Sequence, residues 1–525
     1  MQQDPTRSTG WTRRRVLQAG GVLVVGGASL AALAIETNAS GGTSRPSIPA
    51  GSASPVAVVR RRYRSRPDLT APPVAVAAPL GTVAPGLVFL TPDNGLAPDG
   101  LLISDNAGKP VWIRPDTGSN AANFRVAQYR GKPVLSWWEG AVNGGYGSGQ
   151  LVIMDETYTE LLRLGAGSGR KADIHEFQIT AANTALLLSD GGVPDPAGAS
   201  PSPWQNWDCV VEEVDIATGN VLFEWHSVDH ISPDESVLPA PSATASPAAK
   251  ATSGGLAPLG TAAAPSQPVY DTVHVNAIEL DSDGNLLVSA RNTSTIYKVD
   301  RASGAILWRL GGKKSDFQMG AGTTFALQHD ARRHPDGSLT IFDDGQAPGT
   351  ASRAIVLNVD EVAMTASLVH SYAHPHAKLA TSQGNTQVLP NGNVFVGWGS
   401  TGYASEFSAD GQLLFDADFS GSIQSYRCFR FPWVAQPVEA PAVAVDPPAN
   451  GSINVYASWN GATDVATWEA LSGADSSHLA SLGTFPRTDF ETTMSVKAGG
   501  TVLVVHALDA NGTVLGSSAP VTLQD

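Results

Sequence analysis

A single pattern recurs through most of the chain and limits the possible folds more than any other feature of the sequence. Each copy has a Gly-led strand, a turn, a second strand, an Asp-x-x-(Thr/Ser)-Gly turn and a strand that often carries Trp; the clearest copy spans 284–310. Copies begin near residues 100, 149, 184, 284, 337 and 392, and the last three starts are 53 and 55 residues apart. Propeller blades repeat at about 40–50 residues. The sequence therefore predicts an all-β fold with a six-bladed β-propeller over residues 70–435.

Two segments interrupt or follow this repeat. Residues 232–267 are rich in Ser, Pro, Ala and Gly, which predicts a long low-complexity surface loop within one blade. After Pro432 the chain changes to short alternating strands separated by turns, over residues 436–525. This pattern is typical of a small fibronectin- or immunoglobulin-like β-sandwich, in which we expect Trp459 to be a core aromatic residue.

The N-terminal residues 1–39 are expected to be a targeting signal. Arg13 and Arg14 form a twin-arginine pattern, and an uncharged apolar run from Ala19 to Ala34 follows them. That run is shorter than the roughly 20 residues of a membrane-spanning helix, so a cleaved signal peptide is favoured over an uncleaved anchor. Residues 40–69 form a Pro-, Ser- and Arg-rich linker and lead-in. We expect export by the twin-arginine machinery to an extracellular, periplasmic or cell-envelope location.

Charge and cysteine content exclude some classes of function. Residues 1–70 hold 10 Arg and 3 acidic residues, which leaves 23 basic and 45 acidic residues in the rest of the chain. A body this acidic is unsuited to nucleic acid, because phosphate contacts depend on clustered Lys and Arg. Cys209 and Cys428 allow at most one disulfide and have no zinc-site spacing; the sequence does not decide whether they pair.

Three of the eleven histidines occupy the same phase of the repeat, shortly before a Gly-led inner strand: His175, His274 and His329. Equal phase in a propeller means equal height along the axis, so we expect them to converge on one end of the central channel. Arg353 follows the third of these inner strands and is expected to reach the same mouth. A guanidinium beside imidazoles suits a tetrahedral oxyanion, because its forked donors match two of the oxygens.

Each of these histidines has an aspartate one to three positions away, namely Asp173, Asp271 and Asp330. Such carboxylates either orient an imidazole tautomer or cap turns. Metal binding by the three imidazoles is the rival chemistry.

Several segments between about residues 60 and 435 resemble the arylsulfotransferase family, in its second, less characterised branch. They include Leu135-Ser136-Trp137-Trp138-Glu139-Gly140, His175-Glu176-Phe177, Gln328-His329-Asp330, Ser425-Tyr426-Arg427, and residues 63–69, 224–230, 271–276 and 384–393. Their order along the chain makes the resemblance specific. The C-terminal sandwich lies outside it.

The resemblance implies a six-bladed propeller that transfers a sulfuryl group from a phenolic (aryl) sulfate to a phenol. It implies a transferase that uses no nucleotide donor, no cofactor and no metal, and that passes the group through a sulfohistidine. Carried over by motif, His274, His329 and Arg353 are the expected catalytic residues. His175, Asn276 and His230 are the expected substrate-binding residues.

One departure from the family leaves alternatives open. The family's carrier histidine belongs near Ser382-Gln383-Gly384-Asn385, where this chain has none; His370, His374 and His376 lie upstream. The nucleophile is His274, His329, an upstream histidine, or absent. A non-catalytic propeller that binds a ligand or the cell wall is therefore the alternative function, and a metal-dependent lyase or hydrolase is a third.

Overall fold

The computed structural model describes residues 60–77, 81–93, 100–115, 118–143, 145–191, 205–240, 269–345, 350–419, 423–497 and 499–523. It confirms the all-β expectation. Within these ranges the only α-helix is α1 (Ser227–His230), beside the 3₁₀ turns η1 (Gly167–Gly169), η2 (Pro233–Glu235) and η3 (Gly399–Thr401). No helix in the described part of the chain is long and apolar enough to cross a membrane. The expected signal peptide and residues 40–59 of the linker lie outside the described residues.

Most strands can be divided into six antiparallel groups of four strands, numbered here in chain order; a pairing of Ala172 with Gly149 joins groups 2 and 3 into one eight-stranded sheet, and groups 5 and 6 each carry a fifth strand. Group 1 contains β30 (Cys428–Phe431), β4 (Leu87–Leu90), β5 (Leu101–Ser104) and β6 (Pro110–Arg114); group 2 contains β7 (Asn120–Tyr129), β8 (Lys132–Asn143), β9 (Tyr146–Met154) and β10 (Glu160–Leu164); group 3 contains β11 (Ala172–Ile179), β12 (Thr184–Asp190), β14 (Cys209–Asp215) and β15 (Val221–His226). Group 4 contains β17 (Val275–Leu280), β18 (Leu286–Ala290), β19 (Thr295–Val299) and β20 (Ile306–Gly311); group 5 contains β22 (His329–Arg333), β23 (Leu339–Asp343), β24 (Arg353–Asp360) and β25 (Thr365–Ala373); group 6 contains β26 (Asn385–Val388), β27 (Val394–Gly397), β28 (Tyr403–Phe407) and β29 (Leu413–Asp418).

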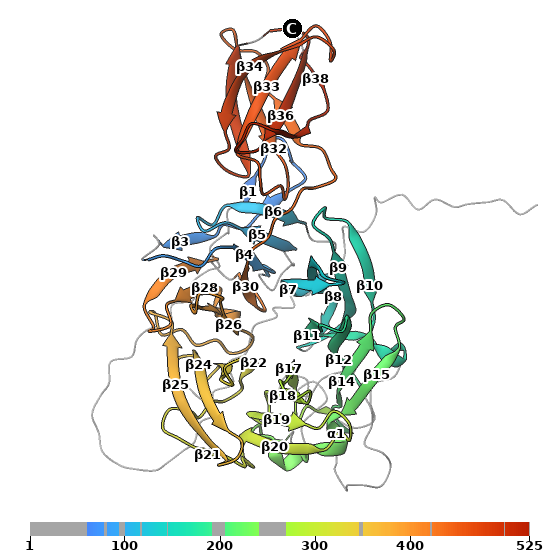
Figure 1. The fold of residues 1–525 in the computed structure, drawn as a ribbon, viewed down its shortest axis with the longest axis vertical. Helices are drawn as coiled ribbons and strands as arrows, with labels where there is room; N and C mark the ends of the chain where they lie inside the picture. Colours follow the sequence, from blue (N-terminus) through green and yellow to red (C-terminus); the bar gives the residue numbers. More distant parts are fainter. Residues whose placement is uncertain are drawn as a thin grey trace, which may run out of the picture. The chain divides into compact units, whose positions relative to one another are not determined.

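The six groups surround a common axis, with their first strands innermost (Figure 1). Two pairings between distant parts of the chain close this ring. The N-terminal strand β3 (Ala75–Ala77) pairs with β29 at the outside of group 6, and β30 pairs with β4 at the inside of group 1. Both closures are antiparallel ladders, so the backbone hydrogen bonds of those strands are satisfied across the join.

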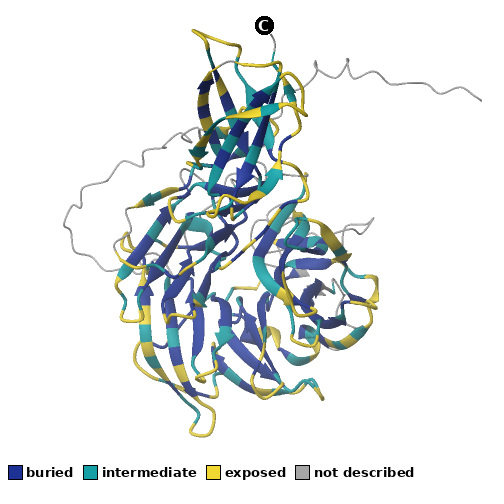
Figure 2. Cartoon of the chain, turned by 45° about the horizontal axis from the view of Figure 1, so that its top comes forward, coloured by how far each residue is buried: buried dark blue, intermediate teal, exposed yellow. Residues whose placement is uncertain are grey.

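The hydrophobic core is divided among the interfaces between neighbouring groups. Six clusters of buried apolar side chains each draw on two consecutive groups; one joins Leu287 and Ile296 of group 4 to Leu339 and Ile341 of group 5. Most strands are therefore covered on both faces, which explains runs such as β18 that are buried along their whole length. Burial follows the strands and exposure follows the outer turns (Figure 2).

The innermost strands are irregular, and the irregularity is repeated. The pairing register shifts within β7, β11, β17 and β22, each time near the axis. Asn123 and Asp330 lie at two of these shifts with φ of 58° and 54°, in the left-handed region, and His274, immediately before β17, has a φ of 53°. A bulge re-aims the side chains beside it, so these strands turn polar residues toward the axis.

At the axis, a buried charge network connects all six groups. Glu176 of β11 accepts hydrogen bonds from Arg125 of β7 at 3.1 Å, from Arg332 of β22 at 2.5 Å and from Arg427, next to β30, at 3.1 Å. Arg427 also donates to the Asn276 carbonyl of group 4, and Asp330 accepts from the Thr386 amide of group 6. Burial alone would raise the pKa of Glu176, but the three guanidiniums hold it well below its ordinary value.

The remaining strands form two short pairs and the C-terminal region. The pairs are β1 (Arg61–Arg62) with β2 (Thr70–Ala71) and β13 (Gln205–Asn206) with β16 (Val269–Tyr270), and β21 (Gln318–Met319) flanks group 5. The C-terminal sheets contain β31 (Ala442–Val445), β32 (Ser452–Ser458) and β35 (Glu491–Lys497) in one, and β33 (Thr467–Gly473), β34 (Leu479–Pro486), β36 (Val502–Leu508), β37 (Val514–Ser517) and β38 (Val521–Thr522) in the other.

The C-terminal region has its own core and ordered contacts with the rest of the body. Trp459 is buried, with 6% of its surface exposed, in a cluster formed only by residues of this region. Asn460 exchanges two hydrogen bonds of 2.8 Å with the backbone of Ile113 in β6. The lead-in is ordered as well, since Tyr63 packs on Phe490 at 4.4 Å between ring centroids.

The structure adds detail to three expectations from the sequence. The repeat start at residue 149 lies in β9, the third strand of its group, because β8 (Lys132–Asn143) is the second. Residues 232–240 of the predicted surface loop are ordered and include the buried Glu235, whereas 241–268 lie outside the described residues. Cys209 and Cys428 are both buried, and no disulfide joins them.

The axial network predicts a strong dependence of stability on one carboxylate. Replacing Glu176 with Gln keeps its shape but removes the one carboxylate that all three buried guanidiniums share, so we expect a loss of about 3–5 kcal/mol in the free energy of unfolding. The matched control is Glu160→Gln, which removes a surface pair with Arg163 and should cost at most about 1 kcal/mol. Equilibrium denaturation of both variants measures the difference, and equal losses would contradict the assignment of the network.

Candidate functional site

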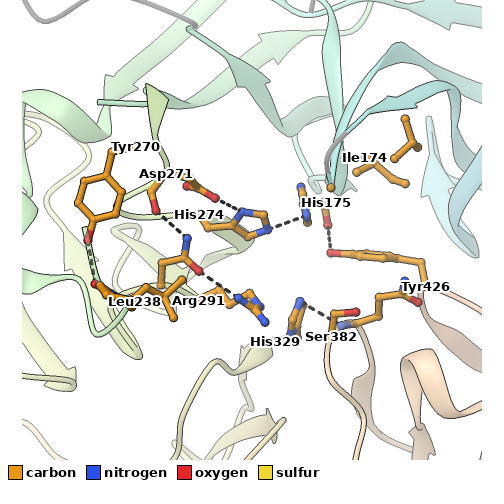
Figure 3. A pocket seen from close by; sticks show the side chains of 15 residues that line it. Ile174, His175, Leu238, Tyr270, Asp271, His274, Arg291, His329, Ser382 and Tyr426 are labelled. Carbon is orange, nitrogen blue, oxygen red and sulfur yellow. Dashed lines mark hydrogen bonds and ion pairs between the residues drawn. The ribbon is translucent and has the colours of Figure 1, made fainter. Parts of the chain in front are cut away.

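The three histidines of equal phase meet at one end of the axis, as their placement in the repeat predicts. His175, His274 and His329 line the same cavity, of about 320 Å³, together with Arg291 and Tyr426 (Figure 3). That volume is within the range of small-ligand sites. His175 lies in β11, His274 immediately precedes β17, and His329 begins β22, so consecutive innermost strands supply one imidazole each.

Each imidazole is held at Nδ1 by a buried carboxylate. His175 pairs with Asp173, His274 pairs with Asp271 at 2.7 Å, and His329 pairs with Asp344 at 2.5 Å. Because Nδ1 is committed to a carboxylate in all three, Nε2 is the nitrogen that is left for chemistry.

The carboxylates of Asp173 and Asp271 are in their ionised form. Burial alone would raise both pKa values, but the adjacent imidazoles and further donors lower them. Those donors are the Gly147 amide at 2.7 Å from Asp173 and the Tyr146 hydroxyl at 2.8 Å from Asp271. An ionised carboxylate accepts only, so His175 and His274 both carry a proton on Nδ1.

His175 and His274 contact each other through their remaining nitrogens. The two Nε2 atoms are 3.2 Å apart, and the rings are nearly perpendicular, with centroids 4.7 Å apart. At that distance, two unprotonated nitrogens would set their lone pairs against each other. The contact is a hydrogen bond only if one proton lies between them.

His329 is isolated from the pair and has a different environment. The backbone N–H of Gln383 donates to its Nε2 at 3.2 Å, so that nitrogen holds a lone pair and the proton of the dyad lies on the Asp344 side. Burial and the positive charge of Arg291 lower the pKa of His329 well below its usual range. Burial likewise raises the pKa of Asp344 well above its ordinary value. His329 is a neutral imidazole whose Nε2 lone pair accepts the Gln383 N–H, a bond that it must give up before it can react.

Arg291 supplies the fixed positive charge of the cavity. It follows β18, and its side chain donates to the Thr381 carbonyl at 3.0 Å and to Asn292 at 3.1 Å. The cavity lining also includes apolar groups, namely Val142, Ile174, Leu238, Pro239 and the Tyr270 ring. The cavity thus combines cationic and imidazole groups with apolar surface.

Three residues that the sequence placed at the site lie outside the cavity lining. Arg353 pairs with Asp343 at 2.9 Å and with the Thr324 carbonyl at 2.7 Å. Asn276 is buried and donates to the Gln328 carbonyl. His230 stacks on Trp225, with 5.0 Å between ring centroids.

One of the three carboxylates that we expected beside the histidines does not hold its histidine. Asp330 does not contact His329; it accepts from Arg332 and Thr386 in the axial network. Asp344 takes the position on His329 instead. Among the described residues, no group of three or more His, Cys, Asp or Glu side chains has the placement that a metal ion requires.

The residues that sequence reasoning missed share one topological signal. In an antiparallel pair, the end of one strand lies beside the start of its partner. Arg291 follows the second strand of group 4, and Asp344 follows the second strand of group 5, so both lie at the end where the inner strands begin. Arg353 begins a third strand, one position farther from the axis.

The comparisons with known proteins agree with this picture. A family model described as arylsulfotransferase (ASST) matches residues 125–420, more than half of the chain. The fold and site define an all-β protein with an axial pocket suited to an oxyanion. The chain belongs to the arylsulfotransferase family.

No curated protein matches the sequence significantly. Among solved structures, it is similar to a protein of unknown function from Bacteroides caccae, with 13% identity over 66% of this chain and 99% of that one and a TM-score of 0.39. Kuenenia stuttgartiensis hydrazine synthase gives 11% identity over 59% and 74%, with a TM-score of 0.31. A catalytically inactive variant of virginiamycin B lyase from Staphylococcus aureus, solved with quinupristin, gives 8% over 74% and 97%, with a TM-score of 0.32.

Because Arg291 lines the cavity and Arg353 does not, we expect Arg291 to be the arginine that binds an anion there. A charge-assisted hydrogen bond contributes about 1.5–3 kcal/mol, so Arg291→Gln should weaken the binding of inorganic sulfate by about 10- to 100-fold. Arg353→Gln is the matched control and should bind sulfate as the wild type does. Calorimetric titration with sulfate measures both, and a loss confined to the Arg353 variant would contradict this placement of the site.

Proposed function

We propose that this protein transfers a sulfuryl group from an aryl sulfate to a phenol, through a sulfohistidine and without a nucleotide donor. The observation that carries the proposal is the convergence of three carboxylate-held imidazoles and Arg291 on one cavity with apolar surface. The family membership supports the same reaction class. The apolar surface suits an aromatic ring, and the cationic groups suit a sulfate ester.

His329 is the nucleophile in this proposal. His175 and His274 direct their Nε2 atoms at each other, whereas the Nε2 of His329 meets only a backbone N–H at 3.2 Å. A neutral imidazole attacks better than a protonated one, and the pKa of His329 is low because of burial and Arg291. Attack forms a bond from Nε2 to sulfur and breaks the bond from sulfur to the aryl oxygen. A phenol then takes the group from His329.

Arg291 stabilises the sulfuryl oxygens during both steps. A preorganised donor at a developing charge is worth about 2.7–4 kcal/mol in related acyl-transfer sites. Arg291 is held by two hydrogen bonds, so its guanidinium is fixed before substrate enters. This arrangement needs only the chain's own side chains to balance the charge of the sulfate ester.

We also propose the domain arrangement and location that the sequence indicates. The six four-stranded groups around one axis support a six-bladed propeller over residues 70–435, and the two C-terminal sheets support a fibronectin- or immunoglobulin-like sandwich over 436–525. The twin-arginine pattern at residues 1–39 supports export to an extracellular, periplasmic or cell-envelope location.

The test is sulfuryl transfer from 4-nitrophenyl sulfate to a phenol acceptor, followed by nitrophenol release. We expect release that depends on the acceptor and is abolished by His329→Asn, because Asn keeps a donor for Asp344 but has no Nε2. His230→Asn, outside the cavity, is the control and should retain activity. Mass spectrometry of the quenched enzyme should locate the sulfuryl group on the peptide that contains His329.

Two results would contradict the proposal. Binding of aryl sulfates without turnover in the wild type would favour the non-catalytic propeller. Activity that is lost with chelators and restored by a divalent metal would favour the metal-dependent alternative.

A further inference from the structure

The His175–His274 contact has a consequence beyond binding. Both Nδ1 atoms donate to ionised carboxylates, and the two Nε2 atoms are 3.2 Å apart (Figure 3). The pair must therefore hold one proton between its Nε2 atoms, since two lone pairs would repel and two protons would clash. Burial and the nearby charges of His175 and Arg291 lower the pKa of His274, so the proton that the pair shares is held weakly and is easily given up.

We propose that the His175–His274 pair is the acid–base group of the reaction, and that its shared proton goes to the departing aryl oxygen. This inference rests on the proposed sulfuryl transfer. It assigns the pair a role different from that of Arg291, which carries fixed charge, and of His329, which carries the sulfuryl group. The pair lies on the cavity wall, and the His274 side chain is 13% exposed.

The proton and electrons balance over the two steps. In the first step, the lone pair of His329 Nε2 forms the bond to sulfur, the electrons of the sulfur–oxygen bond go to the aryl oxygen, and that oxygen takes the shared proton. In the second step, the acceptor phenol returns a proton to the pair as its oxygen bonds to sulfur. The electrons of the nitrogen–sulfur bond then return to His329.

The geometry suits the pair both to give a proton in the first step and to accept one in the second. While the proton is present, the anionic sulfate ester stabilises the charge of the pair. Once the proton has left, two lone pairs face each other at hydrogen-bond distance, and that repulsion makes the pair a stronger base for the acceptor phenol. The groups that face the pair and set its proton affinity are Asp173, Asp271, Tyr146, Tyr426, Arg291 and His329.

Tyr146 is a positioning residue for this pair. Its hydroxyl donates to Asp271 at 2.8 Å, and its ring lies edge-on to both imidazoles, with centroids 5.7 Å from His175 and 4.8 Å from His274. Removing the hydroxyl leaves more negative charge on Asp271. That charge should raise the proton affinity of His274.

The first test uses the leaving group. His175→Asn and His274→Asn each keep a donor for the carboxylate but lack Nε2. With phenyl sulfate, whose phenol has a pKa near 10 as in Tyr, turnover should fall about 100-fold or more, the usual range of general acid catalysis. With 4-nitrophenyl sulfate, whose leaving group needs little protonation, turnover should fall less than about 10-fold. His230→Asn is the control for both donors.

Equal losses with the two donors would overturn this inference and leave the pair as a binding group only. Absence of turnover in the wild type would overturn the proposed function and this inference with it.

The pH dependence of turnover gives a second readout. Turnover of phenyl sulfate should fall as pH rises and the pair loses its proton, and the Asn variants should lack this limb. Tyr146→Phe should move the limb to higher pH; an unmoved limb would show that Tyr146 has only a structural role.

Discussion

The structure depends on a single buried carboxylate at its axis. Glu176 accepts from three arginines that belong to three different groups of strands. Through Arg427 and Asp330 the same network reaches the other three groups. Apolar packing is shared only between neighbours, because each core cluster joins two consecutive groups. The axial ion network is the part of the structure in which all six groups meet, and it sets how their inner strands are placed relative to one another.

The site is built on the same inner strands, directly beside this network. His175 precedes Glu176 in β11, and His329 precedes Asp330 in β22. In each case, one residue lines the cavity and the next joins the ion network. The register shifts in these two strands, with left-handed backbone at Asp330, place consecutive polar residues at the axis where a regular strand would alternate its faces. Strain at those positions is thus tied to the construction of the site.

Sequence periodicity was sufficient for the class of fold and for the three histidines, because both depend on a repeat that can be counted along the chain. It was not sufficient for Arg291, Asp344 or Tyr146. Arg291 lines the cavity, whereas Asp344 and Tyr146 reach its histidines through hydrogen bonds to His329 and Asp271, over 15 and 125 residues of the chain. All three belong to a second or third strand of their group or follow one. Arg353, which we expected at the cavity mouth, begins a strand one position farther from the axis and does not line the cavity. Proximity in the sequence also predicted Asp330 as the carboxylate partner of His329, whereas in the fold that partner is Asp344.

The placement of charge explains how an acidic protein can bind an anion. The body after residue 70 has 45 acidic and 23 basic residues, yet four arginines lie at or beside the axis. Arg125, Arg332 and Arg427 are paired there with Glu176, Asp330 and Glu279, and Arg291 lines the cavity. The charges of Arg291 and Arg427 add to burial, which is the largest cause, in lowering the pKa of His329, and the same positive charge favours the sulfate ester of the proposed reaction. A change that removes this positive charge should therefore weaken binding of that ester and raise the pKa of His329 together.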